Sequence, residues 1–161
     1  MIPTKQDVEK AFFEAMAAGY AQSIKKTPIP DLPGSKAIIS VDGHFRVVDY
    51  WLVTANSNKS TGSTTIWFDE QPVWVMHYGG WYDKDVIPFL KKCLHRAYVE
   101  ERKFYGGRGP TEVKDRDLRY NNEIDRNDFF NARGEEFVYD FSGDDKKCRG
   151  FHWYRCMSLL P

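Results

Sequence analysis

Apolar and polar residues alternate one by one over much of this chain, and a period of two is typical of a half-buried β-strand. The pattern is densest in residues 63–80, STTIWFDEQPVWVMHYGG, where two runs rich in aromatic and β-branched residues flank the polar sequence DEQP. Such runs, separated by a few turn-forming residues, predict a β-hairpin. Its second strand carries large side chains on both faces, with Trp74 and Tyr78 on one and His77 on the other. This distribution predicts a central strand that is covered on both sides.

Further strands are predicted before and after this hairpin. In the block of residues 37–80, two more alternating runs flank Asp42-Gly43, a dipeptide that favours a tight turn. A second block of strands covers residues 113–160 and ends in the alternating sequence RGFHWYRCMSLL. The stretch at the beginning of this second block carries charges of both signs, which favours a solvated hairpin or loop.

Two segments have the helical period instead, with apolar residues three or four positions apart. The first covers residues 1–24, and Thr4 followed by Asp7 resembles a capping box at its start. The second covers residues 83–103 and contains the sequence FLKKCLH, with Pro88 near its first turn. Each segment has one apolar face, so we expect both helices to pack on the sheet.

Together these elements predict a single α+β domain over residues 1–161. We expect an antiparallel, twisted sheet of about seven or eight strands, with the N-terminal helix and one central helix packed on one of its faces. A parallel α/β fold does not fit, because the predicted strands follow one another through short turns instead of helices.

Composition argues against several classes of protein. Charged residues make up 29% of the chain and 23 basic residues balance 23 acidic ones, so no overall field attracts nucleic acid or an anionic membrane. No apolar run is long enough for a membrane span or for the core of a secretion signal, which favours a cytoplasmic protein. The three cysteines, Cys93, Cys148 and Cys156, lack the spacing of a zinc site or a disulfide framework, and we predict no metal site and no cofactor.

Aromatic residues make up 16% of the chain, which favours either a dense core or a ligand cleft. Trp74, His77 and Tyr78 are candidates for the walls of such a cleft, and core packing is the alternative. Asp49 lies between apolar residues in a predicted strand, and a buried carboxylate needs hydrogen-bond partners. It is therefore either a structural hydrogen-bond hub or a residue of the site.

Arg108 lies in the loop sequence FYGGRGPT, whose glycines and proline exclude regular secondary structure. The loop lacks the Lys-Ser/Thr of a P-loop and does not open a helix, so it does not predict a nucleotide-phosphate site. An arginine presented by glycines suits a carboxylate or phosphate group of a ligand. The alternative is an ion pair with a carboxylate of the protein that pins the loop, and the sequence leaves both open.

Several motifs, taken in order, resemble a bacterial domain of unknown function that is found alone or fused behind an XRE-type helix-turn-helix. They are GYAQ, VDYW, QPVWVMHYGG, FLKKCL, GGRGP, FFNARGEEFVYD and FHWYRC. The resemblance covers nearly the whole chain, is most specific in QPVWVMHYGG and RGP, and implies a bacterial or phage origin. It also implies that five residues belong to one shared pattern: Trp74, Tyr78, Arg108, Gly109 and Pro110. His77 departs from that pattern, because relatives usually have asparagine there.

Three hypotheses for function follow from these observations. The favoured one is a soluble, non-enzymatic binding or sensory module that holds a small polar or anionic ligand in an aromatic cleft. Its contact residues are expected to be Asp49, Trp74, His77, Tyr78 and Arg108. The second is a hydrolase-like enzyme in which His77 or His152 pairs with Asp49 or Glu135 for acid–base chemistry, although no catalytic motif is present. The third is a protein-blocking factor that acts by covering a protein partner.

Overall fold

A computed structural model describes residues 2–21, 26–105 and 108–161. Within these residues, two α-helices and eight strands follow one another in the order α1, β1–β4, α2, β5–β8. The helices are α1 (Lys5–Ala21) and α2 (Ile87–His95), and α2 is flanked by a 3-10 turn, η1 (Lys84–Val86), and a π turn, η2 (Arg96–Glu101). The strands are β1 (Ser35–Asp42), β2 (Phe45–Val53), β3 (Lys59–Phe68), β4 (Gln71–Tyr82), β5 (Glu112–Asp115), β6 (Leu118–Arg126), β7 (Arg133–Asp140) and β8 (Lys147–Ser158). Neither of these helices is long and apolar enough to cross a membrane.

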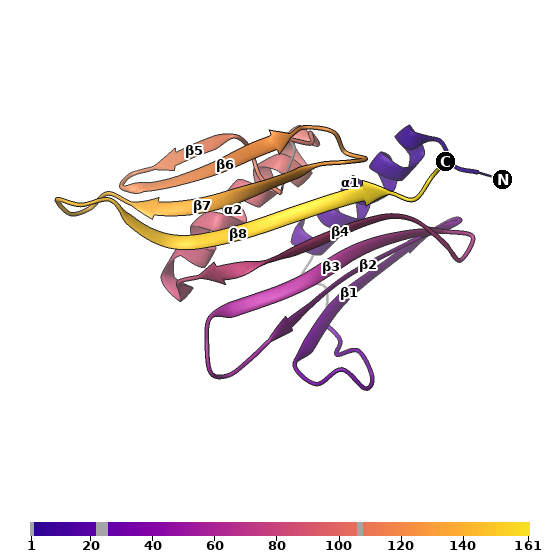
Figure 1. The fold of residues 1–161 in the computed structure, drawn as a ribbon, viewed down its shortest axis with the longest axis horizontal. Helices are drawn as coiled ribbons and strands as arrows, with labels where there is room; N and C mark the ends of the chain where they lie inside the picture. The colour runs from indigo at the N-terminus through magenta and orange to yellow at the C-terminus, as the bar shows by residue number, and fades with distance from the viewer. Residues whose placement is uncertain (1, 22–25, 106–107) are drawn as a thin grey trace.

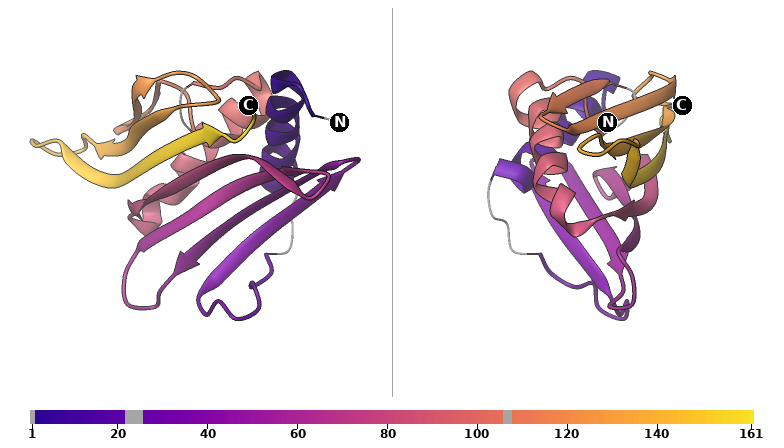
Figure 2. Two further views of the ribbon diagram at one scale, coloured as in Figure 1. Left: turned by 45° about the vertical axis from the view of Figure 1, so that its right-hand side comes forward. Right: turned by 90° about the vertical axis from the view of Figure 1, so that its left-hand side faces the viewer.

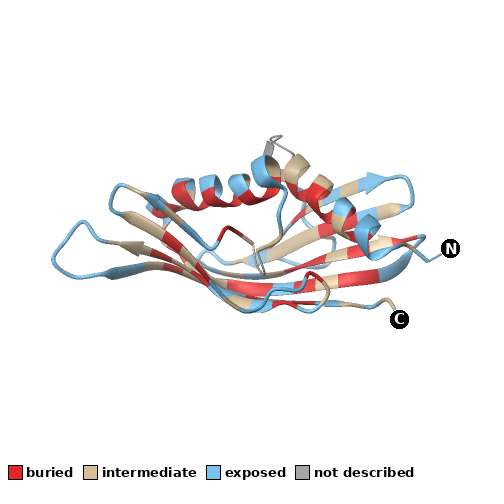
Figure 3. Ribbon diagram, turned by 90° about the horizontal axis from the view of Figure 1, so that it is seen from above, coloured by how far each residue is buried: buried red, intermediate tan, exposed pale blue. Residues whose placement is uncertain are grey.

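The eight described strands form one antiparallel sheet in the order β1-β2-β3-β4-β8-β7-β6-β5 (Figure 1). The pairing of β4 with β8 sets Tyr78 opposite Tyr154 and joins two four-stranded meanders at the centre of the sheet. Both helices lie along the same face of the sheet, as the rotated views in Figure 2 show. Seen from above in Figure 3, the buried residues of the helices point toward the curved sheet. We call the opposite face of the sheet the outer face.

The α+β class predicted from the sequence is wrong, because the protein is mostly β. Strands account for 48% of the described residues and helices for 22%. The second predicted helix, residues 83–103, corresponds to continuous helical turns from Lys84 to Glu101, of which regular α-helix covers Ile87–His95. The charged stretch near residue 113 forms a paired hairpin of β5 and β6, and the central strands β4 and β8 are 12 residues long each. Of the hairpin and the loop expected for the charged stretch, the hairpin forms, and the protein is mostly β because the two described helices cover the eight-stranded sheet only in part.

Helix α1 begins where the sequence predicts and packs through its apolar face. Thr4 and Asp7 form the capping box, since the backbone N–H of each donates to the side chain of the other at 3.1 and 3.2 Å. Phe12 is fully buried and packs edge-on against Trp74 and Phe129. Trp74 stacks on Phe129 with ring centroids 4.7 Å apart, and its indole N–H donates to the Phe129 carbonyl at 2.7 Å. This aromatic cluster fixes the helix over the sheet.

The two meanders share one internal arrangement. In each, a tyrosine of the last strand lies across a glycine of the neighbouring strand, with Tyr78 paired to Gly62 and Tyr154 paired to Gly134. A Cβ atom on Gly62 would lie 2.8 Å from the Tyr78 hydroxyl, and one on Gly134 would overlap the Tyr154 hydroxyl. Both glycines are therefore required by the close approach of a tyrosine ring.

Replacing Gly134 with alanine should lower the free energy of unfolding by about 1–3 kcal/mol, because the site has no room for a methyl group. The new Cβ atom overlaps the Tyr154 hydroxyl and lies 2.5 Å from the backbone oxygen of Glu123, which the β6–β7 pairing holds in place. Gly143→Ala is the matched control, since a Cβ atom there meets nothing within 4 Å. Chemical denaturation measures both variants, and equal stability would contradict the close approach.

Candidate functional site

A cavity of about 1060 Å³ lies between the helices and the sheet. Five polar residues on its wall form what we call the floor: Asp49, Thr64, Tyr78, Arg108 and His152. Four of them come from neighbouring inner strands, because alternate residues of β2, β3, β4 and β8 point to the helix-covered face. Apolar side chains of both helices and the sheet complete the walls, among them Met16, Ile38, Met76 and Leu90.

Asp49 is a hydrogen-bond hub at one end of the floor. Its Oδ1 atom accepts hydrogen bonds from the Thr64 hydroxyl at 2.8 Å and from the Tyr78 hydroxyl at 2.7 Å. Burial raises the pKa of Asp49, and these two hydrogen bonds and the nearby Arg108 charge oppose that rise. The carboxyl group is thus held in a fixed position while it still borders the cavity.

Arg108 joins the loop to the floor through an internal ion pair. Its Nη1 atom lies 3.1 Å from Oε1 of Glu136 and also donates to Nδ1 of His152. The guanidinium carbon lies 5.4 Å from the centroid of the Tyr78 ring, a cation–π distance. Of the two roles that the sequence left open for Arg108, the internal pin is therefore present in the structure.

Glu136 is the carboxylate that Arg108 pairs with, and it has no solvent exposure. Two tyrosine hydroxyls also donate to it, Tyr82 at 2.5 Å and Tyr120 at 2.6 Å. Burial and the charge of Glu136 raise the pKa of Tyr120, so this hydroxyl stays protonated and donates. Sequence reasoning considered the neighbouring Glu135 and missed Glu136. The available signal was alternation, which places Glu136 on the same face as the buried Val138.

His152 is a neutral side chain inside this network. Burial, and then the charge of Arg108, lower its pKa to about 2 from an ordinary value of 6.5. Its Nδ1 atom accepts from Arg108, and its Nε2 atom is buried without a hydrogen-bond partner among the residues that the structure describes. The distance from Nδ1 to Oε1 of Glu136 is 3.9 Å. A histidine that stays neutral and whose acceptor nitrogen is occupied does not have the geometry of a general base.

The structure brings together three of the five residues that the sequence proposes as ligand contacts. Asp49, Tyr78 and Arg108 meet at the floor of the cavity. Trp74 is fully buried in the aromatic core beside Phe129.

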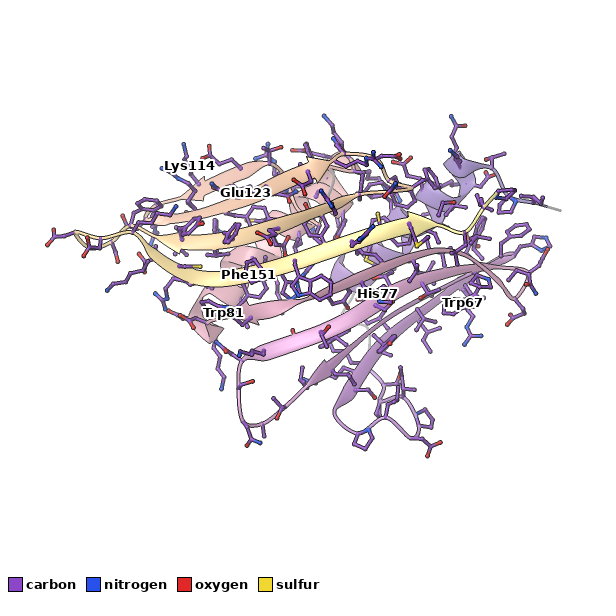
Figure 4. The ribbon with its side chains drawn as sticks, in the orientation of Figure 1. Trp67, His77, Trp81, Lys114, Glu123 and Phe151 are labelled. Atoms are coloured by element: carbon purple, nitrogen blue, oxygen red, sulfur yellow. The ribbon has the colours of Figure 1, made fainter. Side chains whose placement is uncertain are left out.

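His77 is exposed on the outer face of the sheet, where Figure 4 shows it on β4 with Trp81 further along the same strand. The sequence predicted that β4 would be covered on both sides, but His77 on its outer side is exposed. Glu135 is exposed as well, and its strand pairing with Trp153 sets it on β7 away from the floor. Of the histidine–carboxylate pairs considered for acid–base chemistry, those with His77 or Glu135 are thus not at the cavity, whereas His152 and Asp49 both border it without a hydrogen bond between them among the described residues.

Among the described residues, no group of three or more His, Cys, Asp and Glu side chains is arranged to hold a metal ion. The polar groups of the floor instead offer hydrogen bonds from fixed positions. The arrangement is suited to holding a polar group of a small molecule.

A family model described as a domain of unknown function (DUF5680) matches residues 55–149. No curated protein and no solved structure matches the chain. The matched stretch includes Tyr78, Arg108 and Glu136, and it leaves out Asp49 and His152.

Removing Arg108 should lower the free energy of unfolding by about 3–5 kcal/mol, because Glu136 then remains buried without a cation. Arg108→Ala is compared by chemical denaturation with Arg46→Ala, which breaks an exposed ion pair to Glu70 at 3.6 Å. The control should lose only about 0–1 kcal/mol. A similarly small loss in both variants would show that Arg108 does not pin the fold.

Lowering the pH below about 6.5 should destabilise the protein, and His152 should contribute to the loss. Its pKa is about 2 in the folded protein and 6.5 ordinarily, so only the unfolded chain takes up a proton between these values. The stability from the neutral His152 is complete above pH 6.5 and decreases as the pH falls toward 2.

His152→Gln removes this titration and keeps an oxygen that can accept from Arg108. Its free energy of unfolding should therefore fall less steeply with decreasing pH than that of the wild type, by up to about 1.4 kcal/mol per pH unit. Denaturation curves between about pH 4 and pH 7 measure the two slopes. Parallel slopes would contradict the lowered pKa of His152.

Proposed function

The chain belongs to the DUF5680 family, a domain of unknown function, and we propose that it is a non-enzymatic binding domain that holds a small polar or anionic organic ligand. The ligand occupies the cavity between the helices and the sheet. The proposal has to rest on this site, because the family supplies no activity.

The proposal is supported by a large cavity whose floor contains a carboxyl oxygen, Oδ2 of Asp49, that forms no hydrogen bond to the described protein residues. Oδ1 of Asp49 takes both hydroxyl donors, from Thr64 and Tyr78. Oδ2 of Asp49 forms no hydrogen bond within the described part of the chain, and it is not among the fully buried polar atoms. Because Asp49 borders the cavity and is only half-buried, we take this oxygen as the acceptor for a hydrogen-bond donor of the ligand.

The walls suit the body of such a ligand. The volume of about 1060 Å³ lies at the upper end of the usual range for small-molecule sites, about 300–1,000 Å³. Apolar side chains of Met16, Ile38, Met76 and Leu90 border it between the polar floor and the rim. Apolar walls with a few fixed polar groups are typical of small-molecule sites.

The structure offers less support for the other two hypotheses. An acid–base enzyme needs a histidine that titrates near neutral pH, and the pKa of His152 is about 2. A protein-blocking factor needs exposed apolar surface, and one observation favours it: Trp153 and Met157, on the outer side of β8, are 40% and 52% exposed. We keep this second candidate as the reading to adopt if no small molecule binds.

A thermal-shift screen against nucleotides, amino acids, sugars and organic acids should identify a ligand, and Ile38→Trp should abolish its effect. Ile38 borders the cavity opposite Asp49 in the β1–β2 pairing, so an indole there fills the space beside the floor. A ligand at a hundredfold excess over its dissociation constant stabilises the wild type by about 2.7 kcal/mol.

Ile39→Trp is the matched control, because the neighbouring residue points to the other face of β1 and is 49% exposed. It should bind the ligand like the wild type. If no compound shifts the melting temperature of the folded protein, or if both variants bind equally well, the cavity is not a ligand site.

A further inference from the structure

We infer that the ligand is an organic anion with an apolar body, whose negative group is bound at the mouth of the cavity by Lys26 and Lys91 and not at the floor by Arg108. By the mouth we mean the part of the cavity wall formed by the exposed Lys26 and Lys91 and the half-buried Trp51. This inference rests on the proposed function and specifies the chemistry of the ligand and its orientation.

The floor is poorly suited to a negative group. The charge of Arg108 is already compensated by Glu136 at 3.1 Å, and the adjacent Asp49 is a second carboxyl group. An anion placed beside Arg108 would therefore face two carboxyl groups and one cation in a region shielded from water, where like charges repel strongly. The floor is better matched to a neutral hydroxyl or amide group, which can hydrogen-bond to Oδ2 of Asp49.

Most charged residues on the rim of the cavity are paired with a residue of opposite charge. Lys92 lies 2.9 Å from Asp115, and the side chain of Arg96 lies 2.5 Å from Glu101. These cations gain little from a ligand, because each already has a carboxylate within contact distance.

Lys26 and Lys91 differ from the other rim cations. In the described part of the chain neither forms an ion pair, and both border the cavity. Burial, and then the positive charges of Lys91 and Lys36, lower the pKa of Lys26. Like charges are thus held near one another without a carboxylate, and a bound anion would relieve their repulsion.

Trp51 adds an aromatic surface to the same place. The Lys26 ammonium lies 5.2 Å from the centroid of the Trp51 ring. Lys36 lies directly opposite Trp51 in the β1–β2 pairing. Trp51 and Asp49 are two residues apart on β2 and both border the cavity. One strand therefore leads from the cationic mouth to the acceptor on the floor, which defines how an elongated ligand lies.

The test uses 1-anilinonaphthalene-8-sulfonate, an apolar anion whose fluorescence rises on binding, and measures its displacement by octanoate, octylammonium and octanol. These competitors share one chain length and differ in the charge of the head group. Octanoate should displace the dye at least about tenfold more effectively than octylammonium, with octanol between them. Rising salt concentration should weaken octanoate more than octanol.

The double variant Lys26→Gln/Lys91→Gln should weaken octanoate at least about tenfold and leave octanol unchanged. Lys147→Gln, at the exposed beginning of β8, removes a charge outside the cavity and should bind like the wild type. Circular dichroism and melting curves check the fold, and the double variant should be about as stable as the wild type, because it loses both the repulsion between the lysines and the cation–π contact of Lys26 with Trp51.

The outcomes separate this inference from the proposed function. If the dye binds, is blocked by Ile38→Trp, and is displaced equally well by octanoate and octylammonium, the inference is wrong and the binding cavity stands. The same holds if the lysine double variant binds octanoate like the wild type. If the dye does not bind the folded protein, or binds Ile38→Trp unchanged, both the inference and the proposed function are overturned.

Discussion

The antiparallel pairing of β4 with β8 is the constraint on which the remaining structure depends, because it joins two four-stranded meanders into one sheet. Tyr78 and Tyr154 lie opposite each other at this seam, and each ring extends across a glycine of the next strand, Gly62 or Gly134. Each hydroxyl then reaches a polar side chain two strands away, in β2 for the first meander and in β6 for the second. The seam thus ties three adjacent strands together on both sides, which fixes the inner face on which the cavity forms.

The two meanders differ at the positions that decide whether a cavity stays open. In the first, Asp49 lies opposite Thr64 in the β2–β3 pairing, and the Thr64 hydroxyl donates a hydrogen bond to its carboxyl group. Threonine is small, so space is left beside Asp49. In the second, the corresponding pair is Asn122 and Glu136, and a buried carboxylate requires a cation. Arg108 supplies that cation, and its loop closes over the second meander, where Asn122 donates to a loop carbonyl at 3.0 Å. One buried glutamate therefore explains why the loop is pinned there and why the open space remains beside Asp49.

Sequence reasoning reached the local elements and part of the site, and the limits have physical causes. The period of two identifies strands because one face is buried, and the capping box marks the start of α1 because its hydrogen bonds are local. The fold class was wrong in the proportion of strand to helix, because the 12-residue strands β4 and β8 and the paired β5–β6 hairpin contribute more residues than the two helices on one face. Alternation alone already separated His77 from Trp74 and Tyr78, so their grouping into one cleft ignored the geometry of a strand. The repeat of the two meanders is invisible in sequence, because it consists of single glycine and tyrosine positions separated by unrelated residues.

The floor and the mouth of the cavity carry different charges, and we expect them to contribute differently to folding stability and to ligand affinity. The charge of Arg108 on the floor is compensated by Glu136 within the protein, so the fold does not depend on a ligand to neutralise this pair. The lysines of the mouth repel one another mainly in contact with water, where the repulsion costs little without a ligand. A ligand that supplies a negative group gains this interaction only on binding, and apolar contact with the walls adds to it. Under the proposed binding mode, affinity would come chiefly from the mouth and the walls, and Oδ2 of Asp49 would select among ligands, because a bound group that cannot hydrogen-bond to it would leave this oxygen unpaired.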